Sequence, residues 1–136
     1  MPQSTVGHLV YSVRGENLPF YKSLFAFLGW TAGYDVPEML GLWSSNGVGV
    51  WFGAGAKAVA NDYDGPGLNH LALHVESVAA VDETVAYLKS QGVAALFETP
   101  RHRPDFSEPG KTYYQVMFES PDRVLFEVVY VGPYTA

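Results

Sequence analysis

The feature that most constrains the fold is a short strand pattern that occurs twice, 62 residues apart. Residues 7–13 (GHLVYSV) and 69–75 (NHLALHV) both run small or polar, His, Leu, small apolar, large apolar, polar, Val. This alternation predicts a strand with an apolar face and a polar face. His8 lies on the polar face of the first strand, and His70 and His74 lie on the polar face of the second. The chain is therefore expected to contain two copies of one module.

A helix is predicted after each of these strands. Apolar residues recur at helical spacing on a single stripe in each segment: Leu18, Tyr21, Phe25 and Leu28 in the first, and Val78, Val81, Val85 and Leu88 in the second. Ser77 is the expected N-cap of the second helix. Gly29 and Gly92 are the expected stops, because glycine readily adopts the left-handed conformation that ends a helix.

The rest of each copy reads as three short strands separated by turn residues. The predicted strands are roughly 30–35, 39–44 and 47–53 in the first copy, and 93–98, 112–119 and 123–131 in the second. The predicted fold is α+β: two βαβββ modules, at about 4–53 and 68–132, joined by a linker at about 54–67 within one domain of residues 1–136. The two modules are expected to form a curved mixed-sheet half-barrel around a central cleft. The sheet faces opposite the helices would line that cleft.

Composition limits the chemistry. The net charge of −6 gives no electrostatic footprint for nucleic acid, and the chain contains no cysteine for thiolate catalysis or a thiolate metal site. No apolar stretch is long enough to span a membrane, and the N-terminal residues do not resemble a signal peptide, so a cytoplasmic location is expected. Any metal must be held by histidine and carboxylate ligands.

Two stretches carry a resemblance to a known family. Residues 67–75 (GLNHLALHV) and 118–128 (FESPDRVLFEV) resemble the vicinal oxygen chelate superfamily, which includes glyoxalase I, extradiol dioxygenases, fosfomycin-resistance enzymes and bleomycin-resistance proteins. The resemblance implies that His8, His70 and Glu127 hold one divalent metal ion, which would be Fe, Mn, Zn or Ni. Trp51 aligns with Glu127 where glyoxalase I has a fourth ligand, and an indole cannot bind a metal. The implied triad leaves coordination positions open for a substrate.

Other site residues have alternative interpretations. His74 is a candidate catalytic base, but it can equally be a partner of the ligands or a polar lining residue. Trp51, Tyr114, Met117 and Arg101 are the candidate substrate-pocket residues, although strand aromatics are often core residues. Arg101 lies in a segment bounded by Pro100 and Pro109, which is either a lid over the site or a solvated loop.

Two functions from different classes follow. The first is a metal-dependent enzyme of the lyase or dioxygenase type that binds a small oxygenated substrate. The alternative is a bleomycin-resistance-type protein that sequesters a small molecule without catalysis, and a purely structural or regulatory dimer is a third possibility. Met117 stands where extradiol enzymes carry a tyrosine, ten residues before the final glutamate, and Trp51 departs from glyoxalase I. Members of the family commonly pair, so a homodimer is expected.

Overall fold

The computed structural model describes residues 1–134 and divides into two compact units, Met1–Ala60 and Asn61–Ala136. The boundary falls inside the predicted linker of residues 54–67. Each unit combines one α-helix with one four-stranded mixed sheet, and neither sheet closes into a barrel. The α+β class and the repeated βαβββ order are confirmed. The assignment of both modules to one domain stays a prediction.

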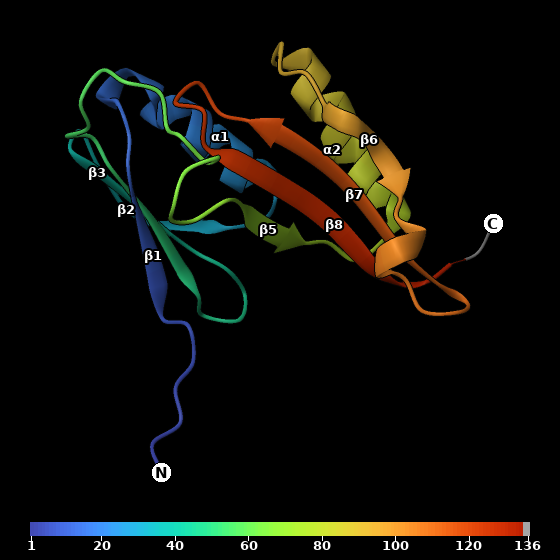
Figure 1. The fold of residues 1–136 in the computed structure, drawn as a ribbon. Helices are drawn as coiled ribbons and strands as arrows, with labels where there is room; N and C mark the ends of the chain where they lie inside the picture. Colours follow the sequence, from blue (N-terminus) through green and yellow to red (C-terminus); the bar gives the residue numbers. More distant parts are fainter. Residues whose placement is uncertain (135–136) are drawn as a thin grey trace. The chain divides into compact units, whose positions relative to one another are not determined.

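The first unit has its sheet in the order β1-β4-β3-β2, with α1 against one face (Figure 1). Only β1 and β4 pair in parallel. Its elements are β1 (His8–Ser12), η1 (Gly15–Asn17), α1 (Leu18–Phe27), β2 (Thr31–Val36), β3 (Met39–Trp43) and β4 (Gly49–Gly53).

The core of the first unit is aromatic. Phe52 of β4 is fully buried, and its ring lies 4.2 Å from the ring of Tyr21 and 5.6 Å from that of Phe25, both on α1. Tyr11 of β1 stacks on the same ring at 5.5 Å. The predicted helix stripe and the predicted apolar strand face therefore meet. His8, one position out of phase, is exposed on the other face.

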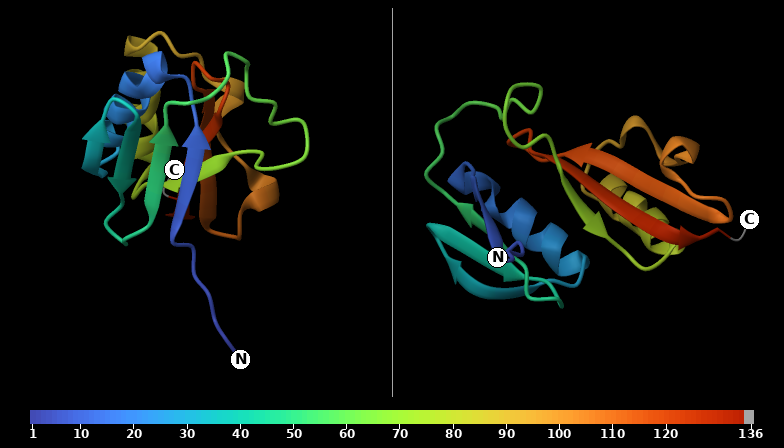
Figure 2. Two further views of the ribbon diagram at one scale, coloured as in Figure 1. Left: turned by 90° about the vertical axis from the view of Figure 1, so that its left-hand side faces the viewer. Right: turned by 60° about the horizontal axis from the view of Figure 1, so that its bottom comes forward.

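The second unit repeats this arrangement with the sheet order β5-β8-β7-β6. Its elements are β5 (Leu71–His74), α2 (Val78–Ser90), β6 (Leu96–His102), η2 (Pro104–Phe106), β7 (Lys111–Glu119) and β8 (Leu125–Pro133). Figure 2 shows α2 lying along one face of the long β7–β8 ribbon. Among residues 1–134, no helix has both the length and the apolar composition needed to cross a bilayer.

The predicted ends of α2 are confirmed. The Ser77 hydroxyl accepts a hydrogen bond from the Ala80 N–H at 3.0 Å, which satisfies one of the free donors of the first turn. Gly92 has a φ of +73°, and Gly29 after α1 has a φ of +83°. Both glycines adopt the left-handed conformation expected at a helix stop.

Two predicted strand boundaries were wrong. β6 extends to His102, so Arg101 belongs to a strand rather than to the loop predicted between Pro100 and Pro109. β8 begins at Leu125 rather than at Arg123, because Arg123 has a φ of +62° and belongs to the turn.

Candidate functional site

A cavity of about 630 Å³ opens in the second unit. Its apolar and aromatic lining residues are Tyr63, Phe97, Phe106, Tyr113, Met117 and Leu125. Its polar lining residues are Asp64, Asn69, His70, Arg103, Gln115 and Glu127. Such a cavity, apolar with a few converging polar groups, is the usual form of a small-molecule site.

Glu127 is the most buried acid in this cavity, with 3% of its surface exposed. It lies in the middle of β8, directly opposite Met117 of β7. Alternate residues of β7 share that face, so Tyr113 and Gln115 point to the same side as Met117. The Tyr113 hydroxyl donates a hydrogen bond to Oε1 of Glu127, and the Gln115 side-chain amide donates one to Oε2. Both carboxylate oxygens are therefore held by named donors.

The orientation of the Gln115 amide is set by Arg103. Nη1 of Arg103 donates to Oε1 of Gln115 at 2.9 Å, which leaves the amide nitrogen facing Glu127. Arg103 is itself fixed by Asp105, whose two carboxylate oxygens accept from Nε at 3.3 Å and from Nη2 at 3.1 Å. This hydrogen bond lowers the pKa of Asp105. The guanidinium also lies 4.5 Å from the centre of the Phe106 ring, a cation–π contact.

Tyr113 remains a proton donor at neutral pH. Burial is the largest cause of its raised pKa, and the hydrogen bond to Glu127 adds to it. Both effects favour the neutral phenol, because an ionised phenolate would be poorly solvated and would face a carboxylate. The site thus contains a fixed O–H group beside the carboxylate.

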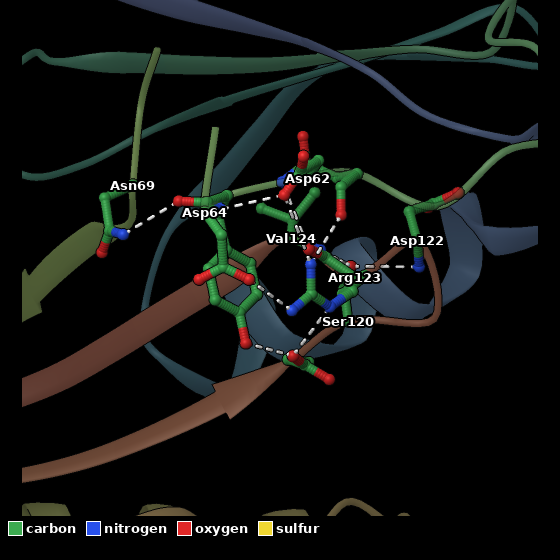
Figure 3. Close-up of polar contacts among 10 residues, drawn as sticks. Asp62, Asp64, Asn69, Ser120, Asp122, Arg123 and Val124 are labelled. Carbon is green, nitrogen blue, oxygen red and sulfur yellow. Dashed lines mark hydrogen bonds and ion pairs between the residues drawn. The ribbon is translucent and has the colours of Figure 1, made fainter. Parts of the chain in front are cut away.

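His70 is oriented by its neighbour Asn69. The Asn69 Nδ2 donates to the backbone carbonyl of Tyr63 at 3.0 Å, a contact drawn in Figure 3. Because a carbonyl can only accept, the amide oxygen of Asn69 must face the other way, and it lies 2.7 Å from Nδ1 of His70. Nδ1 then carries the proton of the neutral ring. The lone pair of His70 is left on Nε2.

The segment that carries Tyr63 is held to the β7–β8 turn by Arg123 (Figure 3). The guanidinium lies 4.1 Å from the centre of the Tyr63 ring, and it donates to the backbone oxygen of Asn61 at 3.2 Å and to Asp64 at 3.1 Å. Glu119 accepts from the Tyr63 hydroxyl and pairs with Nε of Arg123 at 3.4 Å. One side chain therefore fixes the wall of the cavity next to Asn69.

The structure assigns different surroundings to two predicted pocket residues. Tyr114 faces α2, where its hydroxyl donates to Asp82 at 2.7 Å, and burial raises its pKa to about 12. Strand alternation turns Tyr113 into this cavity, which Tyr114 does not line. Arg101 is not a lining residue of this cavity and pairs with Glu98 at 3.5 Å, whereas Arg103 lines it. Met117 does line the cavity, and His74 is exposed at the end of β5 without lining it.

The remaining predicted residues, His8 and Trp51, belong to the first unit. They line a separate hollow of about 390 Å³ together with Gly7, Val10, Met39 and Trp43. Within residues 1–134, no group of three or more His, Asp or Glu side chains gathers closely enough to hold a metal. Of the predicted ligands, His70 and Glu127 share one cavity.

Asn69 and Gln115 were not predicted as site residues. Strand alternation was a usable signal for Gln115, because it has the same parity as Met117 on β7. No sequence signal joins Arg103 to Gln115, since their contact depends on how η2 folds back against β7.

No family model matches the sequence. The uncharacterized protein YqjT of Bacillus subtilis (strain 168) is 41% identical over 63 residues, a match that covers 46% of this chain and 46% of that protein. The chain thus spans a little under half the length of this relative.

Solved structures match nearly the whole chain. A candidate glyoxalase from Bacillus halodurans superposes with a TM-score of 0.79 at 25% identity, over 94% of this chain and 96% of that one. The fosfomycin resistance protein FosX from Listeria monocytogenes, in complex with Mn(II) and sulfate, gives 0.68 at 20% identity, over 95% and 91%. A glyoxalase/bleomycin resistance protein/dioxygenase domain from Frankia sp. EAN1pec gives 0.65 at 22% identity, over 95% and 93%.

Proposed function

The chain has the fold of the vicinal oxygen chelate superfamily, and from this premise we propose that it is a metal-dependent enzyme acting on a small oxygenated substrate. In this proposal His8, His70 and Glu127 hold one divalent ion, and the reaction is of the lyase or dioxygenase type. The observation that supports it most directly is that His70 and Glu127 line the same cavity. The Asn69 amide orients the His70 ring, and the Gln115 amide orients the Glu127 carboxylate.

The donor chemistry of these two residues suits a divalent cation. Because Nδ1 of His70 donates to Asn69, Nε2 carries the free lone pair that a metal requires. The Glu127 carboxylate accepts two hydrogen bonds, and an ionised carboxylate has further lone pairs to offer. No ion pair accompanies this buried acid among the described residues, since the nearby Arg103 is engaged by Gln115 and Asp105. A bound cation would offset the cost of burying that charge.

The chain's own residues would shape the reaction around such an ion. When bound, the metal would polarise a substrate oxygen as a Lewis acid. Tyr113 places a neutral hydroxyl beside Glu127; its one proton is donated to Glu127, so its oxygen is left to accept a hydrogen bond from a substrate hydroxyl. Phe97 and Phe106 line the cavity with aromatic surface, which favours an apolar group on the substrate. The Mn(II) in the FosX structure supports a divalent ion in this fold.

Metal content tests the proposal most directly. The protein would be stripped with chelator, reconstituted with Fe(II), Mn(II), Zn(II) or Ni(II), and analysed for bound metal. We expect about one ion per chain in the wild type and a large loss in His70→Ala and in the His8→Ala/Glu127→Ala double variant. His74→Ala is the matched control: it also removes a strand histidine but should keep the metal. Absence of metal from the reconstituted wild type would refute the proposal.

Turnover then separates the reaction types. Oxidative cleavage of a catechol under Fe(II) would identify a dioxygenase, and turnover of a thiohemiacetal under Zn(II) or Ni(II) would identify a lyase. A loss of turnover in His74→Ala, with its metal retained, would assign His74 the catalytic role predicted from the sequence.

The aromatic lining of the cavity favours one alternative, a bleomycin-resistance-type protein that sequesters a planar ligand. Tight binding of a planar aromatic molecule to the metal-free protein, with no turnover under any metal, would support it. Under either proposal, we expect the protein to form a homodimer and to be located in the cytoplasm. Val10, an apolar strand residue that is 61% exposed, offers surface for a protein contact. Sedimentation of the purified protein measures the oligomeric state.

A further inference from the structure

Two indole rings stand on the exposed face of the first unit's sheet. Trp43 of β3 and Trp51 of β4 lie with their centroids 5.1 Å apart and their planes at 79°. Each ring covers a glycine of the adjacent strand: a Cβ added at Gly33 would come within 2.6 Å of Trp43, and one added at Gly41 within 2.7 Å of Trp51. No larger residue fits beneath either ring as it stands. The glycines thus let both indoles lie close against the sheet.

Strand register brings the nitrogen edges of both rings to one point beside His8. Gly49 is paired with His8 across β1–β4 and with Trp43 across β3–β4, and Trp51 follows two residues later on the same face. A Cβ built at Gly49 would lie 3.4 Å from Nε1 of Trp43, 3.4 Å from Nε1 of Trp51 and 3.3 Å from Cβ of His8. For both indoles, Nε1 is the ring atom nearest to that position. The absence of a side chain at Gly49 leaves the space open.

Neither indole N–H has an acceptor among the described residues, whose polar contacts leave both nitrogens without a hydrogen-bond partner. An indole nitrogen is a donor only, so two such groups facing one point call for an acceptor. The hollow of about 390 Å³ around them is lined by His8, Val10, Met39 and other residues that include no carboxylate. The lining therefore supplies no carboxylate acceptor of its own, and an acceptor at this point comes from water or from a ligand.

We propose that this hollow binds an anionic oxygen group of a ligand, a carboxylate or a phosphate-type group, through the N–H groups of Trp43 and Trp51 next to His8. The inference rests on the proposed function, and it narrows the substrate to small molecules that carry such a group. Two donors about one point match the two oxygens of an anion, and hydrogen bonds to a charged acceptor are the strong ones. A cationic ligand is disfavoured at this point, because the two groups that face it are N–H donors and offer a cation no lone pair.

The indole signals of an ¹H–¹⁵N spectrum test this directly, because the chain has three tryptophans and only two are involved. Trp30, which packs edge-on against Phe25 at 5.1 Å, is the internal control. Metal-free protein would be titrated with sodium benzoate, with sodium phosphate, and with benzyl alcohol, which keeps the aromatic ring but has no charge. We expect saturable shifts of the Trp43 and Trp51 signals with benzoate, phosphate or both, and no such shifts with benzyl alcohol or at Trp30.

Variants that keep an aromatic ring but remove the indole N–H test the two donors one at a time. Trp43→Phe and Trp51→Phe should each weaken anion binding by at least about tenfold, the lower end of the value of one hydrogen bond to a charged group, whereas Trp30→Phe should not. Gly49→Ala, which fills the space between the donors, is the second variant if a tryptophan change unfolds the unit. Equal shifts with benzyl alcohol, or no shift with either anion, would overturn the inference. These titrations use metal-free protein, so they are independent of the metal analysis. If the Trp43 and Trp51 signals shift with an anion but the reconstituted protein binds no metal, only the proposed function is refuted. If the protein binds metal but these signals do not shift, only this inference is refuted.

Discussion

Gln115 offers the sharpest test of how the second unit holds its buried acid. Its side chain is 1% exposed and bridges two charged groups, accepting from Arg103 and donating to Glu127. Gln115→Leu removes both hydrogen bonds while keeping a side chain of similar size. The substitution leaves Glu127 with one side-chain donor, Tyr113.

The expected loss of stability is about 1–5 kcal/mol. Each hydrogen bond to a charged partner contributes about 1.5–3 kcal/mol, so two are worth about 3–6 kcal/mol. The buried leucine regains about 1–2 kcal/mol of apolar transfer free energy. Glu127→Leu alone also destabilises, because it leaves the Gln115 amide and the Tyr113 hydroxyl without their acceptor. The double variant removes both partners and should recover about 2 kcal/mol relative to the sum of the single changes.

The measurement must report on the unfolding of the second unit, where Gln115 lies. All three tryptophans lie in the first unit, so indole fluorescence does not report on Gln115. Hydrogen exchange of backbone amides in the β7–β8 ladder, for example at Val116 opposite Val128, measures the free energy of opening this unit. The metal-free protein would be measured in chelator at neutral pH. A loss below about 0.5 kcal/mol in Gln115→Leu, or strict additivity in the double variant, would refute the bridging role.

Three further predictions concern the tautomer, the packing and the pH dependence. Asn69→Leu should change the ratio of His70 tautomers by about fivefold, the value of one neutral hydrogen bond, in ¹⁵N spectra of the imidazole; an unchanged ratio would show that Asn69 does not orient the ring. In urea unfolding monitored by indole fluorescence, Gly41→Ala should lower the free energy of unfolding of the first unit by about 1–3 kcal/mol, because the new methyl group displaces the Trp51 ring. An unchanged free energy of unfolding would contradict that packing. Burial raises the pKa of Tyr11 to about 12, so its stabilising contribution should be complete below pH 10 and lost as the pH rises towards 12. Unfolding of Tyr11→Phe across that range should be less pH-dependent, and identical pH profiles would count against the burial.

The secondary structure was predicted correctly where the apolar residues of a strand or helix recur on one face. The two histidine-bearing strands, both helices and their glycine stops were predicted from spacing alone, because alternation and the helical stripe follow directly from backbone geometry. The cavity-facing position of Met117 was also within reach of the sequence. The errors came at the ends of strands, where Arg101 remains extended past a proline and Arg123 adopts a left-handed turn. Local propensity does not decide those conformations, which depend on tertiary contacts of the side chains.

The sequence by itself determined the repeated module, the exposed strand face on which His8 lies, and the lack of any thiolate chemistry. Only the tertiary structure decided which groups hold the acid and which tautomer the imidazole adopts. Arg103 meets Gln115 because η2 folds back against β7, and Asn69 meets the Tyr63 carbonyl because Arg123 fixes the segment before β5. The physical reason is that periodicity reports a side chain's face over a few residues, whereas a hydrogen bond depends on distances set by the packing of whole elements.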